Sequence, residues 1–301
     1  MKQNRLILAI TYSLVALFTL IGISTEAQNT PKTIKRIIID PGHGGTDPGS
    51  NGKYSTEAAV SLAISLKLEE YINQSIPDVE VVLTRRTDIY NSVVEKANIA
   101  NAAKGDLFIC IHTNSANPSR DREIIGYTNK TYTVKKKGVK RKVTRRVPLY
   151  KTTYTPSTAR GTETFIYNVG KSDQKKDMAS EAVDDVVEKL DSVSIKQIKE
   201  IEDADPTRSM MISLLTQQYF QRAASLALTI EEEFKAAGRI SREAKQRQKG
   251  IWVLAAVQMP AVLVETGFIS NPEDEDYLNS EEGQNQICEV ITKSVLRYKN
   301  S

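Results

Sequence analysis

Short apolar runs alternate with amphipathic segments through the first third of the chain. Runs rich in β-branched residues, at Lys35–Asp40, Val79–Thr84 and Leu107–His112, are typical of buried strands. Between them, apolar residues recur at helical spacing from about Ser55 to Ile72 and from Val93 to Ala100. This strand–helix–strand–helix–strand order predicts an α/β fold with a largely parallel sheet and right-handed crossovers.

The last third of the chain returns to the same pattern. Apolar runs predict further strands at Gly161–Tyr167, Gly250–Leu254 and Pro260–Glu265. A final amphipathic helix is expected from about Gln284 to Tyr298. Together with the first third, these elements are sufficient for a sizeable core.

Two insertions interrupt the alternation. Residues from about Ala116 to Arg160 are strongly basic, with no acidic residue between Ile124 and Thr162, and Thr, Val and Tyr alternate with the bases. A solvated β-hairpin and a flexible charged loop fit this pattern equally well, and either could be attracted to an anionic polymer. The second insertion, from Gln174 to Gln248, is predicted to be predominantly helical.

The chain contains only two histidines, and both follow a predicted buried strand. His43 lies in the turn Asp40-Pro41-Gly42-His43-Gly44-Gly45, and His112 ends the run Leu107–His112. Polar residues at the carboxyl ends of strands in open α/β sheets are where active sites form. One such histidine would more often be structural, but two in matching positions favour a shared site.

Two carboxylates are expected at the same sheet edge. Glu57 falls in the first turn of a helix, where it could simply stabilise the helix dipole or could act as a metal ligand. Glu265 ends the predicted strand Pro260–Glu265. His43, His112 and one of these carboxylates would make a catalytic zinc set with an open fourth position. A further carboxylate can transfer protons, so the set suits hydrolysis of an amide.

Several motifs resemble the zinc-dependent N-acetylmuramoyl-L-alanine amidases. The resemblance rests on the His43 turn, Glu57 at a helix start, Thr84-Arg85 with Asp88, Ile111-His112-Thr113-Asn114, and Val264-Glu265-Thr266-Gly267-Phe268-Ile269-Ser270-Asn271. It implies one α/β domain over residues 34–301, with a twisted, mostly parallel sheet flanked by helices. It also implies one Zn²⁺ ion and cleavage of the amide between N-acetylmuramic acid and L-alanine in peptidoglycan. By position, His43, Glu57 and His112 would be the metal ligands and Glu265 the catalytic carboxylate.

The resemblance extends to division-associated members with a helical insertion. In those proteins the insertion covers the active site until an activator displaces it. An acidic side chain of the insertion could occupy the fourth zinc position here, and ordinary solvated helices are an equally good interpretation; the candidates are Glu188, Glu200, Glu202 and Asp203. The chain departs from the family pattern at Ala58, at Thr113 and at Lys96, where an arginine is usual. These departures affect substrate contacts rather than the ligands or the base.

The first residues are typical of a targeting segment. Residues 1–27 combine a basic start, an apolar run and small residues at a cleavage position, followed by a polar linker over 28–33. An uncleaved membrane anchor is the alternative. Either predicts export to the periplasm or cell envelope. Cys110 and Cys288 are expected to be buried free thiols.

Three functional classes remain to be compared. The first is an exported amidase acting on peptidoglycan in daughter-cell separation, regulated by an activator protein and monomeric. The second is a zinc peptidase acting on peptidoglycan stem peptides, and the third is a non-catalytic wall-binding module, which the presence of His43, Glu57, His112 and Glu265 disfavours. No nucleic-acid partner is expected, because the basic insertion lacks a recognised module and the chain carries an export segment.

Overall fold

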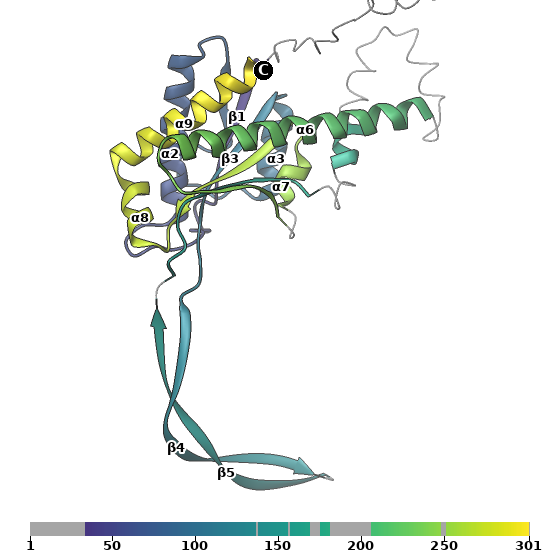
Figure 1. Ribbon diagram of the computed structural model, residues 1–301. Helices are drawn as coiled ribbons and strands as arrows, with labels where there is room; N and C mark the ends of the chain where they lie inside the picture. The colour runs from purple at the N-terminus through teal and green to yellow at the C-terminus, as the bar shows by residue number, and fades with distance from the viewer. Residues whose placement is uncertain are drawn as a thin grey trace, which may run out of the picture.

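A six-stranded sheet forms the centre of the molecule (Figure 1). The computed structural model describes residues 34–136, 138–155, 157–168, 175–180, 206–247 and 251–300. The strand order is β2-β1-β3-β8-β6-β7, and the strands from β2 to β8 run parallel. β6 is antiparallel to β8 and parallel to β7. The strand bounds are β1 Arg36–Pro41, β2 Glu80–Leu83, β3 Leu107–Asn114, β6 Thr162–Ile166, β7 Ser241–Gln246 and β8 Ala261–Phe268. The predicted mostly parallel α/β sheet is confirmed.

Helices cover both faces of this sheet. Ile37 and Ile39 of β1 pack in a cluster with residues of three long helices, whereas Ile38 packs in a second cluster with two short ones. Because both faces are covered, the central strands are apolar at successive positions rather than at alternate ones. The long helices are α2 Glu57–Ser75, α6 Pro206–Ala236 and α9 Glu281–Lys299, the short ones are α3 Val93–Ala102 and α7 Trp252–Ala256, and α8 Pro272–Asn279 follows β8.

The predicted strand at Gly250–Leu254 is wrong, because α7 occupies this part of the chain. A short apolar run does not distinguish a buried strand from a buried helical turn. Carbonyl groups at the end of α7 are hydrogen-bonded by a side chain that is distant in the sequence, so the apolar run itself does not reveal this contact. The buried Lys175 Nζ donates hydrogen bonds to the carbonyls of Leu254, Val257 and Met259 at 3.0, 2.5 and 2.8 Å.

The predicted helical insertion is correct for α6 and wrong near its end. α6 starts at Pro206 and stops before Gly238, whose φ of +83° is the left-handed conformation common after helices. The following residues form β7 at the sheet edge, although Ser-Arg-Glu-Ala-Lys-Gln has little strand propensity. Pairing with β6 and two ion pairs to Glu163 override that local preference: Arg242 Nε and Lys245 Nζ lie 2.5 and 3.1 Å from its Oε1.

The basic insertion forms a hairpin rather than a flexible loop. β4, Ser119–Lys136, pairs with β5, Val139–Thr155, and the ribbon projects far from the sheet (Figure 1). Cys110 and Cys288 are buried free thiols, as predicted, and pack on opposite faces of the sheet. Within the described ranges, no helix has the length and apolar character needed to cross a membrane.

Some predictions concern other parts of the chain. The targeting segment 1–27, the linker 28–33 and the acidic candidates of the insertion all lie outside the described residues, the candidates being Glu188, Glu200, Glu202 and Asp203.

Candidate metal centre and active site

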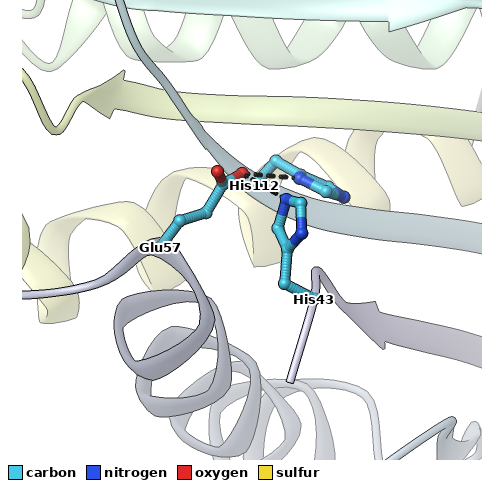
Figure 2. A group of neighbouring side chains, drawn as sticks. All are labelled: His43, Glu57 and His112. Carbon is cyan, nitrogen blue, oxygen red and sulfur yellow. Dashed lines mark hydrogen bonds and ion pairs between the residues drawn. The ribbon is translucent and has the colours of Figure 1, made fainter. Parts of the chain in front are cut away.

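Three side chains from separate elements converge at the carboxyl edge of the parallel strands (Figure 2). His43 follows β1, Glu57 is the first residue of α2, and His112 lies near the end of β3. Each offers one ligand atom, and these atoms all lie within 4.8 Å of one another. Glu57 Oε1 is 2.7 Å from His112 Nδ1 and 3.2 Å from His43 Nε2. The sequence therefore predicted this juxtaposition, which no local motif contains.

The turn that carries His43 is fixed from several sides. His43 itself has a φ of +55°, which is uncommon for a residue with a side chain. A Cβ atom at Gly42 would lie 2.6 Å from the His112 ring, so only glycine allows the two histidines to approach. The buried Arg85 donates from Nη2 to the carbonyls of Gly42 and Ala58, which ties the turn to the start of α2.

Asp88 also holds this turn. Its Oδ1 accepts a hydrogen bond from the Gly45 amide at 2.8 Å. Asp88 does not cap the following helix, because Ser92 is the N-cap of α3 and forms a reciprocal capping box with Glu95. Asp88, four residues before Ser92, contacts the turn that carries His43 instead.

The electrostatics of the cluster favour a protonated His43 beside an ionised Glu57. Burial alone would lower the pKa of His43, but Glu57 and Asp47 outweigh it and raise the pKa to about 9. Burial would raise the pKa of the Glu57 carboxyl, but hydrogen bonds from His112 and His43 hold that pKa well below its usual range. Ser50 N also donates to Glu57 Oε2 at 2.9 Å. Glu57 is therefore a buried, ionised carboxylate.

The donor set and its surroundings fit a divalent metal ion. The two distances from Glu57 Oε1 to the ring nitrogens are close to the roughly 3.3 Å expected between two ligands of tetrahedral zinc. Asp47 Oδ2 lies 2.7 Å from His43 Nδ1, so His43 can donate there and present Nε2 as a neutral ligand. A carboxylate behind a ligating histidine is the usual supporting contact of zinc sites. These three residues could hold one cation.

Glu265 lies beside the cluster on the adjacent strand. His112 and Glu265 are register partners in the parallel pair β3–β8. The side chain is 5% exposed, and its Oε2 has no hydrogen-bond partner among the described residues. Burial, followed by the charge of Glu57, raises the pKa of Glu265 to about 8. An unpartnered buried carboxylate requires an explanation, and proton transfer to and from a reacting group is one.

A cavity of about 650 Å³ opens over these residues. Its lining includes the three candidate ligands and Glu265, together with Arg247, which follows β7, and Trp252, the first residue of α7. The cavity is therefore large enough for part of an extended ligand, and it combines acidic, basic and aromatic groups.

Lys96 supports the end of β1, which leads to His43. Its side chain is buried, its Nζ donates to the Pro41 carbonyl at 2.7 Å, and it lies 3.0 Å from Asp40 Oδ1. Asp40 also accepts from Thr84 Oγ1. The departure from the family's usual arginine therefore still supplies a cation at the strand end that leads to His43.

Removing that cation should destabilise the protein strongly. We expect Lys96→Met to lower the free energy of unfolding by about 3–5 kcal/mol, because it leaves the Asp40 carboxylate buried without its charge partner. Denaturant unfolding measures the change. Lys96→Arg is the control, and it should retain most of the stability. Equal stability of wild type and Lys96→Met would show that the pair contributes nothing.

Sequence reasoning assigned no positioning role to several residues that hold the site. Asp47, Arg85 and Thr266 contact the histidines or their turn, Thr266 by donating from Oγ1 to the His112 carbonyl at 3.0 Å. Asp47 carried a usable signal, because it lies four residues after His43 in the same glycine-rich turn. The other contacts join elements far apart in sequence and depend on the folded arrangement.

Comparison with known proteins identifies similar sequences and folds. Residues 37–297 match the N-acetylmuramoyl-L-alanine amidase family. The chain is 26% identical to AmiC of Escherichia coli over 87% of its own length and 52% of AmiC, and thus spans about half of that relative. It is 24% identical to AmiA of E. coli K12, over 91% of the chain and 81% of AmiA. A crystal structure of an N-acetylmuramoyl-L-alanine amidase from Clostridium difficile 630 shares the fold, with 23% identity, a TM-score of 0.54, and coverage of 89% and 98%.

Proposed function

The chain belongs to the N-acetylmuramoyl-L-alanine amidase family, and we propose that it is an exported, zinc-dependent member that cleaves peptidoglycan during daughter-cell separation. The observation that carries the zinc assignment is the convergence of His43, Glu57 and His112 within 4.8 Å. The unpartnered carboxylate of Glu265 on the adjacent strand supports hydrolysis at the same place. The apolar segment within residues 1–27 supports export.

The site residues divide the work of amide hydrolysis. His43, Glu57 and His112 would hold the ion, and Asp47 would keep His43 in the tautomer that presents Nε2. A zinc ion held there polarises a carbonyl group and acidifies water. Glu265 takes a proton from the attacking water and passes it to the nitrogen of L-alanine as the C–N bond breaks. The products are the free lactyl carboxylate and an intact stem peptide.

Product analysis distinguishes this reaction from peptidase activity. We expect the mature protein with about one zinc per chain to release intact stem peptides from purified sacculi, detected by mass spectrometry. Shortened stem peptides would instead assign a peptidase. Bare sugar strands must appear in parallel with the released peptides.

We also propose that the helical insertion regulates the site through an activator protein. The sequence pattern and the resemblance to division-associated amidases support this role. The product assay tests it with a second chain that lacks residues 181–205. Higher activity of the shortened chain at equal zinc content supports a covering role, and equal activity contradicts it.

A further inference from the structure

The hairpin of β4 and β5 is built as an extended arm. Its strands pair continuously from Ser119–Thr155 to Lys136–Val139, with one irregularity between Ile124 and Gly126. The two strands form a separate sheet and do not join the central one. An isolated two-stranded ribbon gains little stability from its own contacts and encloses no hydrophobic core. Its side chains are available to another molecule.

The arm carries a large excess of positive charge. Residues 119–155 contain twelve lysines and arginines and two acidic residues, Asp121 and Glu123. Both acidic residues lie near the base of the arm, so the distal part is purely basic. Among the side chains that the structure describes in the hairpin, no base is within 4 Å of an acidic partner. Such an uncompensated field attracts polyanions.

Aromatic side chains accompany the charges. Tyr127, Tyr132, Tyr150 and Tyr154 are between 44% and 60% exposed. The guanidinium of Arg146 lies 4.4 Å from the centre of the Tyr127 ring, and that of Arg122 lies 5.6 Å from the Tyr150 ring. The tyrosine rings offer flat apolar faces beside cationic groups. This combination suits a polymer that has both sugar rings and carboxylates.

Both ends of the arm are fixed beside the candidate active site. The chain enters from β3, two residues beyond His112, and the Ala116 amide donates to Ser270 Oγ at 2.9 Å. It returns through Gly161, whose amide donates to Asp274 Oδ2 at 2.8 Å. It then continues directly into β6, which is paired with the strand of Glu265. The base of the arm therefore lies near the cavity, and a long polymer bound along the arm can extend from its distal end to the cavity (Figure 1).

We propose that this hairpin is a substrate-anchoring arm that binds polymeric peptidoglycan through the carboxylates of its stem peptides and through its sugar rings. The inference rests on the proposed function and deepens it. Binding along the arm raises the local concentration of scissile bonds at the cavity without contributing to the chemical step. Anionic lipid is disfavoured, because the far end pairs Lys135 with Lys140, and the exposed apolar side chains beside them, Val134 and Val139, are small.

The test neutralises the arm and keeps the catalytic site intact. The variant replaces four distal lysines with glutamine, and a matched control replaces the same four with arginine: Lys130, Lys135, Lys140 and Lys142. Binding is measured by co-sedimentation with purified sacculi, and activity is measured on sacculi and on a small soluble muramyl peptide. Circular dichroism confirms that each variant is folded.

The glutamine variant should bind sacculi and cleave them about tenfold less well, while its rate on the soluble muramyl peptide stays at the wild-type value. The arginine control should match wild type on both substrates, and wild-type binding should weaken as salt is raised. Unchanged binding by the glutamine variant overturns the proposal. So does binding to phosphatidylglycerol vesicles in place of sacculi. Failure of both the wild type and the chain that lacks residues 181–205 on the soluble peptide would instead overturn the proposed function.

Discussion

Replacing Glu265 with glutamine should lower the rate of peptidoglycan cleavage by a factor of about 10²–10⁴, the usual contribution of a general acid–base group. The substitution keeps the shape of the side chain at a position that is 5% exposed, so the fold should tolerate it. It removes only the ability to accept and return a proton. Metal content per chain should remain the same, because Glu265 is not one of the three converging ligands. Stem-peptide release and zinc analysis on the same sample measure both quantities.

Glu163 provides a matched control on the neighbouring strand. It is the register partner of Glu265 in the β6–β8 pair and is also buried. Unlike Glu265, it has partners for its charge, since it accepts from Asn114 Nδ2 at 3.0 Å and pairs with Arg242 and Lys245. Glu163→Gln should therefore affect stability more than the rate per folded molecule. If Glu163→Gln abolished peptidoglycan cleavage while Glu265→Gln did not, Glu163 rather than Glu265 would be the general base.

The sheet and the site edge could be predicted because their signals are local. Strands buried on both faces are continuous apolar runs, and both histidines follow such runs. In a parallel sheet the carboxyl ends of adjacent strands share one edge, so the position of a residue at a strand end determines its neighbours. This is why residues as distant as His43, His112 and Glu265 could be placed together from the sequence.

The wrong predictions for α7 and β7 have a common physical cause. In each case, contacts with residues distant in the sequence determine the local structure. α7 depends on Lys175, which donates to the carbonyls at its end. β7 depends on Glu163, which pairs with two of its bases. The contact of Lys96 with Asp40 is likewise invisible in the helix pattern that contains the lysine. Local propensity and periodicity carry no information on such contacts.

Removing a ligand should have an even larger effect than removing the base. His112→Ala deletes one of two imidazoles from the cluster and leaves Glu57 without its 2.7 Å contact. We expect zinc content to fall from about one ion per chain to almost none and cleavage to fall by a factor on the order of 10³ or more. Elemental analysis after dialysis gives the zinc content. Adding back zinc should not restore the variant, whereas it should restore wild-type protein stripped with a chelator.

Asp47→Asn should give a zinc affinity between those of wild type and His112→Ala. Asp47 does not belong to the converging set, but its Oδ2 lies 2.7 Å from His43 Nδ1. Loss of such a supporting carboxylate typically weakens metal affinity about 10–100-fold, so the variant should be active in excess zinc and inactive at limiting zinc. Competition with a chromophoric chelator gives the affinities. The order wild type, Asp47→Asn, His112→Ala follows only if the ion lies between His43, Glu57 and His112. Full zinc affinity in both variants would place the ion elsewhere, and Glu265 would then have no activated water to deprotonate.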